Sequence, residues 1–143
     1  MASSSDTELR GEELGRALGP GDKVLLVGPL GAGKTTLVKG VARAHAVKDD
    51  VTSPTFTLIH TYQGARGALH HVDLYRIDDP SELEETGLYE IWLSGDPVLC
   101  EWGDKLPPGV AREATLRIEL LIDGDGRVLR ASGRRGLISK LPW

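Results

Sequence analysis

The sequence predicts an α/β sandwich with a mixed central sheet, and two observations support this prediction. First, the apolar run "KVLLVG" is followed by a glycine-rich segment and then by apolar residues at helical spacing. Second, two pairs of strand-like runs flank short segments rich in turn-forming residues, which is typical of β-hairpins. A strand that leads into a helix, together with hairpins, indicates helices packed on a sheet.

The elements of the first third of the chain follow from apolar spacing and from turn residues. A helix is expected over about 7–18, with Ser5 or Asp6 as its N-cap and "GPG" as its end. "KVLLVG" is predicted to be a buried strand, because it is a short apolar run between turn residues. A second helix is expected over about 34–45.

The rest of the chain alternates strands, turns and short helices. "TFTLIHTY" and "ALHHVDLY" surround "QGARG", which we interpret as a hairpin turn. "DDPSELEE" begins a helix, because Asp79 can cap it, Pro80 suits its first position and Glu82 can complete a capping box. "GLYEIWL" either extends this helix or forms a second one. "DPVLCEW" is another strand, "GDKLPPG" is a loop, and "ATLRIELLI" and "VLRAS" around "DGDGR" form a closing hairpin.

Length, cysteine content and the N-terminal residues limit the class of protein. The chain has 143 residues, so a single domain over 1–143 is expected. Cys100 is the only cysteine, so no intrachain disulfide can form, and it is expected to be a small apolar strand residue. "MASSSDTELR" has no basic segment followed by an apolar stretch, and no run is long enough to span a bilayer. We therefore expect a cytoplasmic protein without a membrane partner.

Charge is unevenly distributed along the chain. The formal net charge is −4, but no acidic residue follows Asp125, so the basic C-terminal segment 127–143 carries +5 and the rest −9. This segment either meets a phosphate backbone or an acidic partner, or it is a solvated strand with a frayed end. Its basic residues are Arg127, Arg130, Arg134, Arg135 and Lys140.

A phosphate-binding motif follows the first predicted strand. In "GPLGAGKTT", Gly28, Gly33, Lys34 and Thr35 satisfy the P-loop pattern G-x-x-x-x-G-K-[ST]. The predicted strand before it and helix after it are the context that this motif requires. We therefore expect the motif at the carboxyl end of a central strand, where open α/β sheets bind their ligands.

Each residue type in the motif has a chemical reason to be there. Gly31 and Gly33 allow the backbone to turn its N–H groups onto phosphate oxygens, and the following helix adds the positive end of its dipole. Lys34 can reach the β- and γ-phosphates, and the Thr35 hydroxyl can ligate Mg²⁺. Hydrolysis needs more, namely carboxylates near the metal and a group that orients the attacking water.

Two acids are candidates for that role. Asp73 ends "ALHHVD" and Glu101 ends "VLCE", so each follows an apolar strand. If these strands are parallel, both carboxylates lie beside the P-loop, where they can hold Mg²⁺ or water. The alternative is that either acid only caps the next turn.

Two further features are less specific. The segment "TSPTFT", with Ser53 and Thr55, lies where many P-loop NTPases carry a loop that senses the γ-phosphate; the alternative is an ordinary turn into a strand. His70 and His71 are adjacent, so on a strand they point to opposite faces. We expect one of them to be packed or exposed, and a metal pair is not expected.

Together these motifs resemble a known family. "GPLGAGKTT", "TSPTFTLIHTY", "HHVDLYRI", "DPSELEETGL" and "LCEW" occur in the order and spacing of the TsaE family, over roughly residues 5–105. These proteins are the small P-loop ATPases of the bacterial machinery that makes threonylcarbamoyladenosine in tRNA. The resemblance implies a three-layer P-loop NTPase-type sandwich that binds ATP or ADP and Mg²⁺.

The resemblance also implies partners and residue roles. The expected partners are the threonylcarbamoyl transferase subunit and its non-catalytic paralogue, with tRNA met only indirectly through the complex. Lys34, Asp73 and Glu101 are the expected catalytic residues, and Thr35, Glu101 and Asp73 the expected metal-site residues. Thr7, with Gly126 or Arg127, is expected to border the adenine. The expected nucleotide-binding residues are Gly28, Gly31, Ala32, Gly33, Lys34, Thr35, Thr36, Thr7, Ser53, Thr55 and Arg127.

One residue departs from the family pattern, and more than one function remains open. The family usually has Asp after the first P-loop glycine, whereas this chain has Pro29, which lacks a backbone N–H and a negative charge. The favoured function is an ATPase that activates or resets the transferase complex. The alternatives are a nucleotide-gated docking module with incidental hydrolysis and a small-molecule kinase, although no Arg-rich lid segment supports the kinase.

Overall fold

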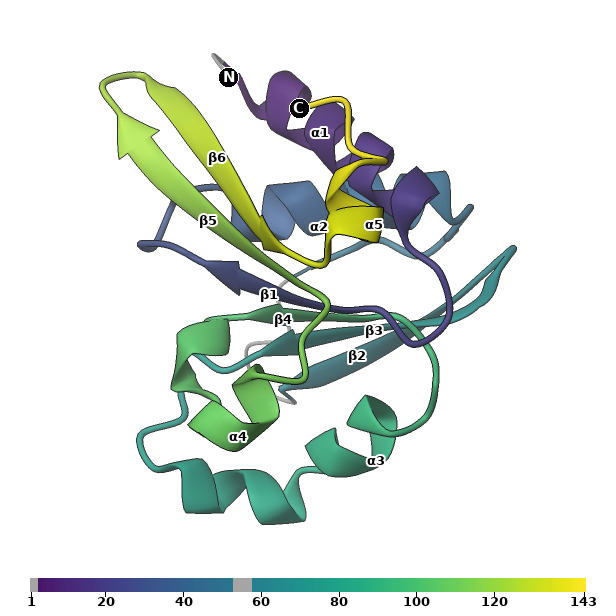
Figure 1. Ribbon diagram of the computed structural model, residues 1–143, viewed down its shortest axis with the longest axis vertical. Coiled ribbons are helices and arrows are strands. Elements are labelled where there is room, and N and C mark those ends of the chain that lie inside the picture. Colours follow the sequence, from purple (N-terminus) through teal and green to yellow (C-terminus); the bar gives the residue numbers. More distant parts are fainter. Residues whose placement is uncertain (1–2, 53–57) are drawn as a thin grey trace.

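The protein is built around a six-stranded sheet with the strand order β2-β3-β4-β1-β5-β6. A computed structural model describes residues 3–52 and 58–143 (Figure 1). The β2–β3 and β5–β6 pairs are antiparallel, whereas β3, β4, β1 and β5 run parallel, so the sheet is mixed as predicted. The strands are β1 Lys23–Val27, β2 Ile59–Gly64, β3 Gly67–Asp73, β4 Val98–Glu101, β5 Leu116–Asp123 and β6 Gly126–Gly133.

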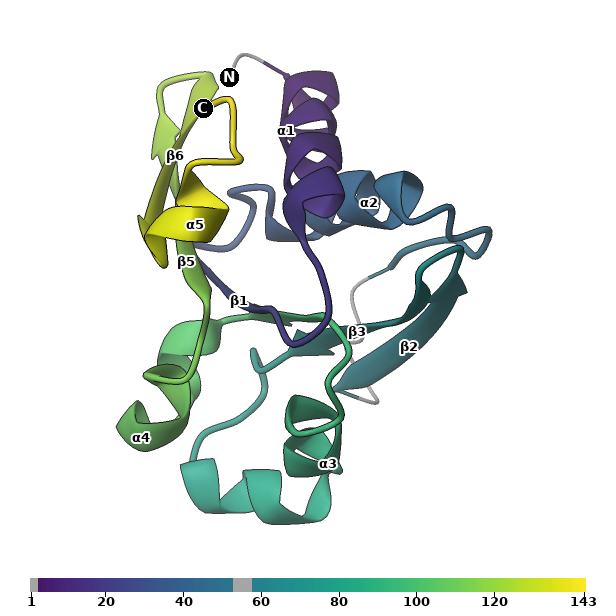
Figure 2. The ribbon, with the colours of Figure 1, turned by 45° about the vertical axis from the view of Figure 1, so that its right-hand side comes forward.

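Helices cover both faces of this sheet, which gives three layers (Figures 1 and 2). One face packs against α1, α2 and α5, and the other against η1, α3, η2 and α4. The two buried apolar clusters lie on these two faces, so the predicted α/β sandwich is confirmed. The helical elements are α1 Ser4–Ala17, α2 Lys34–Ala44, η1 Pro80–Glu85, α3 Leu88–Trp92, η2 Gly103–Lys105, α4 Pro108–Ala111 and α5 Arg135–Ile138.

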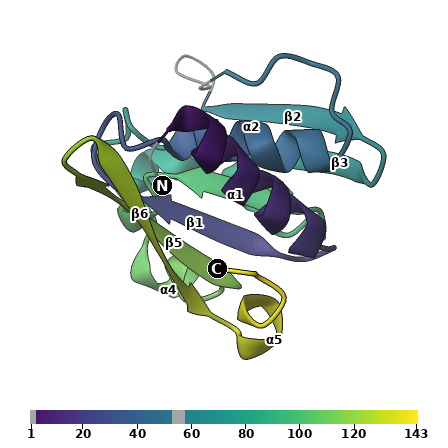
Figure 3. The same ribbon diagram turned by 90° about the horizontal axis from the view of Figure 1, so that it is seen from above.

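The close crossing of α1 over α2 depends on glycines (Figure 3). A Cβ atom built on Gly11 would lie 2.1 Å from the Leu37 carbonyl oxygen, and one on Gly40 would lie 2.0 Å from the Glu8 carbonyl oxygen. Only residues without a Cβ allow the two backbones to approach so closely. This packing fixes the N-terminal half of α1 beside the loop that follows β1.

Most predicted elements are present, but two details were wrong. Helix α1 begins earlier than expected, because Ser3 rather than Ser5 or Asp6 is its N-cap and accepts a bond from the Asp6 N–H at 3.2 Å. "GDKLPPG" is not all loop: it contains η2 and the start of α4, with Pro108 at the first helical position. The capping box of Asp79 and Glu82 is confirmed.

The C-terminal residues are packed rather than frayed. After β6 the chain forms α5, and Leu137 and Leu141 are buried in the cluster that α1 and α2 form with the sheet. Of the alternatives left open for this segment, the frayed end was therefore wrong, because Leu137 and Leu141 pack into this cluster. No helix in the described ranges combines the length and the apolar character needed to cross a membrane.

Candidate nucleotide-binding site

The P-loop connects β1 to α2 at the carboxyl end of a central strand. Gly28, Gly31 and Gly33 have φ values of 157°, 81° and 106°, a region that favours glycine. A Cβ atom on Gly28 would also lie 2.4 Å from the Leu120 carbonyl oxygen of β5. Backbone conformation and a close neighbouring strand thus explain glycine at these positions.

Lys34 is a buried cation held inside this loop. Its Nζ donates to the carbonyl oxygens of Gly28 at 2.6 Å and Pro29 at 2.8 Å, and the residue is 5% exposed. Burial lowers the pKa of Lys34, while the nearby charges of Glu101, Asp73 and Asp104 oppose that shift. The ammonium is therefore compensated by carbonyls and carboxylates around the loop.

The two strand-end acids lie beside the P-loop, as the sequence analysis expected. β3 and β4 are parallel and pair Asp73 with Glu101, and these residues are 6% and 3% exposed. The Thr35 hydroxyl lies 3.0 Å and 2.9 Å from the two carboxylate oxygens of Glu101. Asp73 also caps the turn after β3, because its Oδ1 accepts the Tyr75 N–H at 2.9 Å.

A histidine that the sequence analysis left without a role joins this group. His71 Nε2 lies 2.5 Å from Glu101 Oε2, and its side chain is fully buried. His70 points to the opposite face and pairs with Asp96 at 2.9 Å, so both histidines are buried rather than one. Strand parity could have indicated His71, because residues two apart on a strand share a face and Asp73 is two residues on.

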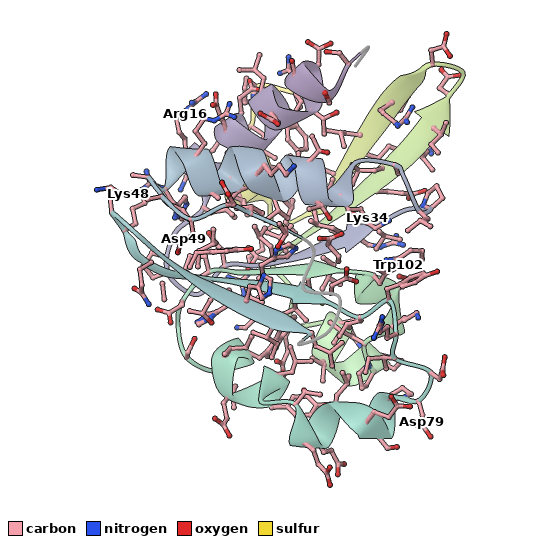
Figure 4. All side chains as sticks on the ribbon, turned by 180° about the vertical axis from the view of Figure 1, so that it is seen from behind. Arg16, Lys34, Lys48, Asp49, Asp79 and Trp102 are labelled. Carbon is pink, nitrogen blue, oxygen red and sulfur yellow. The ribbon has the colours of Figure 1, made fainter. Side chains whose placement is uncertain are left out.

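Trp102 is the second residue that sequence reasoning missed. Its φ of 59° is in the left-handed region, and its ring centroid lies 4.2 Å from Lys34 Nζ (Figure 4). The ring also packs against Tyr75, with centroids 5.2 Å apart. The sequence marks Trp102 only as the end of "LCEW", and nothing there predicts the left-handed turn that brings its ring to Lys34.

Two cavities meet at the P-loop. A cavity of about 410 Å³ is lined by the P-loop, α2, both acids, Tyr75 and Trp102. A cavity of about 200 Å³ is lined by the start of α1, the P-loop and the β5–β6 turn, and it includes Thr7, Ala32 and Arg127. Both cavities include Gly31, Gly33 and Thr36, so they lie on two sides of the same loop.

The second cavity brings together residues far apart in the sequence. Thr7 and Arg127 both lie at the P-loop, and Arg127 Nη2 donates to the Gly31 carbonyl oxygen at 3.3 Å. Ser53 and Thr55 lie outside the described residues. A third cavity of about 440 Å³, between α4, β5 and β6, is lined by none of the predicted site residues that the structure describes.

The oxygen atoms beside Lys34 fit the chemistry of Mg²⁺. Mg²⁺ prefers hard oxygen ligands, and proteins usually supply one or two carboxylates while phosphates and water complete the shell. Thr35 and Glu101 offer such oxygens, and Asp73 lies at the next strand end. Within residues 3–52 and 58–143, no three His, Cys, Asp or Glu residues form a metal cluster of their own.

The fold and site define an α/β protein of the P-loop NTPase type, a class of nucleotide-binding proteins. Within this class, the chain belongs to the TsaE family: the family described as "Threonylcarbamoyl adenosine biosynthesis protein TsaE" matches residues 1–129. The resemblance seen in the sequence motifs is thus confirmed, and the match extends beyond the residues 5–105 that carried it.

Similar proteins agree with this assignment. A "tRNA threonylcarbamoyladenosine biosynthesis protein TsaE" of Treponema pallidum is 37% identical over 124 residues, which cover 87% of this chain and 90% of that protein. A protein of the same name from Mycobacterium tuberculosis is 40% identical over 133 residues, covering 86% and 79%. The crystal structure of "Bacillus subtilus YdiB" has a TM-score of 0.70 at 25% identity and covers 98% of this chain and 87% of that one.

Proposed function

We propose that the chain is a Mg²⁺-dependent ATPase subunit, required for threonylcarbamoyladenosine modification of tRNA, that activates or resets the threonylcarbamoyl transferase complex. The observation that supports it most is the contact of Thr35 with Glu101, because it joins two metal-site candidates from separate elements beside the P-loop. The family and the names of its members support the pathway. The chain itself transfers no group to tRNA.

The residues of the loop bind the phosphates. Backbone N–H groups of the P-loop and the N-terminus of α2 face the triphosphate, and Lys34 exchanges its bonds to the Gly28 and Pro29 carbonyls for bonds to phosphate oxygens. Thr7 and Arg127 border the nucleoside from the smaller cavity. Thr35 and Glu101 would hold Mg²⁺, which would neutralise charge on the phosphate oxygens.

Asp73 contributes more to ATP hydrolysis than to ATP binding. It lies at the strand end next to Glu101 and lines the larger cavity, so it is placed to hold a water molecule or the metal hydration shell. A group that acts mainly on the attacking water changes turnover more than ground-state affinity. Pro29 lacks the acidic side chain that the family usually has there, so we assign the charged roles in hydrolysis to Lys34, Asp73 and Glu101.

A second candidate function is a nucleotide-gated docking module in which hydrolysis is incidental. The observation in its favour is the apolar rim of the larger cavity, where Leu30 is 70% exposed and Tyr75 is 48% exposed. Exposed apolar side chains beside a ligand site suit a surface that a partner subunit covers. Both candidates therefore include the transferase subunit and its non-catalytic paralogue as partners.

Phosphate release under multiple turnover separates these two functions. The chain is mixed with both partner subunits, and complex formation and phosphate release are measured with ATP and with ADP. Continuous release that Glu101→Gln abolishes supports the ATPase, and Glu90→Gln on the exposed face of α3 is the matched control. Nucleotide-dependent assembly without sustained release supports the docking module, and a phosphorylated metabolite would instead indicate a kinase.

A further inference from the structure

The Glu101 carboxylate has a buried partner that lies behind the nucleotide cavity. His71 lines neither cavity at the P-loop, yet its Nε2 lies 2.5 Å from Glu101 Oε2. Both side chains are almost completely shielded from water. Among the described residues that line the two P-loop cavities, His71 contacts Glu101, on which the Thr35 hydroxyl also converges.

The groups around His71 indicate which atom is the donor in the hydrogen bond between His71 and Glu101. A carboxylate accepts hydrogen bonds, so in this pair His71 Nε2–H is the donor and Glu101 Oε2 is the acceptor. On the other side of the ring, Nδ1 lies 3.5 Å from the Tyr62 hydroxyl, and the two ring centroids are 6.2 Å apart. Burial raises the pKa of Tyr62, so its hydroxyl keeps its proton.

Tyr62 is in turn held by residues other than His71 and Glu101. Its hydroxyl donates to the Thr52 carbonyl oxygen at 3.4 Å and lies 3.2 Å from His60 Nδ1. The imidazole of His71 is thus held between a buried tyrosine and the Glu101 carboxylate, both on its own face of the sheet. Turning the ring away from Glu101 would break its contact with Oε2.

A carboxylate that ligates a cation works best when its orientation is already set. Groups that hydrogen-bond a metal ligand hold its geometry, and their removal typically lowers metal affinity about 10-fold to 100-fold. Here His71 contacts Oε2 and the Thr35 hydroxyl contacts both carboxylate oxygens, so the carboxylate is held from two sides while Glu101 still lines the cavity. A freely rotating Glu101 would have to lose that freedom on each binding event.

We propose that His71 is a positioning residue that fixes the Glu101 carboxylate for a divalent cation bound with the nucleotide. This inference rests on the proposed function, because it requires that Glu101 serves the cation. It assigns no contact between His71 and the nucleotide. The expected signature is therefore a loss of cation affinity without a loss of cation-independent nucleotide affinity.

The test compares His71→Asn with His71→Gln in the full chain. The amide nitrogen of Gln reaches the place of Nε2 and can donate to Glu101, whereas the shorter Asn cannot. Affinity for a fluorescent ADP analogue is measured in EDTA and across a Mg²⁺ titration. We expect His71→Asn to weaken apparent Mg²⁺ affinity about 10-fold to 100-fold, His71→Gln to stay within a few-fold of wild type, and affinity in EDTA to be unchanged in both.

His70 provides a matched control on the same strand. It also bonds a carboxylate, Asp96, but on the opposite face, and its Nδ1 lies 2.8 Å from the Thr61 hydroxyl. His70→Asn should therefore lower the melting temperature without changing Mg²⁺ affinity. Equal Mg²⁺ affinity in His71→Asn, His71→Gln and wild type overturns the inference. A wild-type chain whose ADP affinity does not depend on Mg²⁺ overturns the proposed function instead.

Discussion

Lys34 is a buried cation whose hydrogen bonds go to P-loop carbonyls and whose nearest carboxylates include those at the ends of β3 and β4. Its bonds to the Gly28 and Pro29 carbonyls occupy its donors where phosphate oxygens are expected to bind. Because the ammonium already lies among carboxylates and carbonyls, it needs little rearrangement to meet a phosphate. A residue in such a place contributes more to binding anions than to holding the fold.

The first prediction follows from this placement of Lys34. Lys34→Ala should abolish ATP hydrolysis and weaken ATP binding roughly 10-fold to 100-fold, because a charge-assisted bond to phosphate is lost. The loss of unfolding free energy in urea should be much smaller than the loss of binding free energy. Lys39→Ala, on the exposed face of the same helix, is the control. Hydrolysis at the original rate in Lys34→Ala would show that the P-loop does not act on ATP.

A substitution at Asp73 can separate its role as the cap of the turn after β3 from its proposed role in hydrolysis. In Asp73→Asn the side-chain oxygen can still accept the Tyr75 N–H, but the negative charge is gone. We expect turnover to fall at least about 10-fold while ATP affinity and melting temperature change little. Asp79→Asn, which caps η1 away from the cavity, should leave turnover unchanged. Unaltered turnover in Asp73→Asn would mean that Asp73 only caps the turn after β3 and takes no part in hydrolysis.

The residues of the motif could be predicted from sequence, but their supporting residues could not. Lys34 and Thr35 follow from a fixed pattern, and Asp73 and Glu101 follow from strand ends that the parallel sheet brings together. Trp102 reaches Lys34 only through a left-handed turn, and no residue type in "LCEW" demands that conformation.

At the scale of elements, the packing of α1 on α2 is what carries Thr7 to the P-loop. Gly40 faces the backbone of α1, and a Cβ atom there would also lie 2.8 Å from the Gly11 Cα. Backbone atoms in regular helices cannot move aside as a flexible side chain can. The two helices would have to separate to accept any larger residue.

This geometry predicts a coupled loss of stability and nucleotide binding. Gly40→Ala should lower the free energy of unfolding by about 2 kcal/mol or more, because overpacked backbones must shift. Nucleotide affinity should fall with it, because α1 moves Thr7 away from the P-loop. Gly109→Ala in α4, where a Cβ atom meets nothing within 4 Å, is the matched control for urea unfolding. A stability loss in Gly40→Ala no larger than in Gly109→Ala would contradict the close packing.

The end of α2 predicts a pH dependence of stability. His45 is buried, and its Nε2 donates to the Gly15 carbonyl oxygen at 2.9 Å, a carbonyl that Arg66 Nη1 also approaches at 3.0 Å. Burial lowers the pKa of His45 below 6.5, the bond to Gly15 opposes this shift, and the charge of Arg66 adds to it. The unfolded chain therefore binds more protons than the folded one below about pH 6.5.

The contribution of neutral His45 to the free energy of unfolding should therefore be fully present above about pH 6.5 and be lost as the pH falls below that value. Urea unfolding between pH 8 and pH 5 measures this loss, and His45→Gln, which cannot be protonated, should show a shallower decline. A variant with the same pH profile as wild type would mean that His45 does not contribute to the acid sensitivity.

Element types were predictable where local chemistry decides them. The capping box at Asp79 and the two hairpins follow from short-range patterns, and the structure has them. η2, α4 and α5 were missed because helices of three or four residues have too few positions for a periodic pattern. The docking of α5 depends on Leu137 meeting a surface made by distant elements, which no local pattern encodes.

At the scale of the whole molecule, the basic C-terminal segment does not form one concentrated patch. Arg127 lies half-buried at the P-loop end of β6, whereas Arg134 and Arg135 follow the other end of that strand. Eight strand residues at about 3.3 Å each separate the two ends by roughly 25 Å. Arg127 also donates a hydrogen bond to the Gly31 carbonyl oxygen. Fewer than five of the basic side chains are therefore placed to bind the same partner molecule.

Such a distribution predicts that the isolated chain does not bind tRNA measurably at physiological salt. Strong duplex binders make about six to ten phosphate contacts, and their affinity falls steeply with salt, because the release of condensed counterions on binding becomes less favourable. The remaining chain carries −9, which repels RNA further. A gel-shift titration of the purified chain with tRNA near 150 mM salt measures the affinity. Replacing Arg134 and Arg135 with Ser should leave the measured affinity unchanged. Sub-micromolar binding that this double variant loses would instead show that the segment is an RNA contact in its own right.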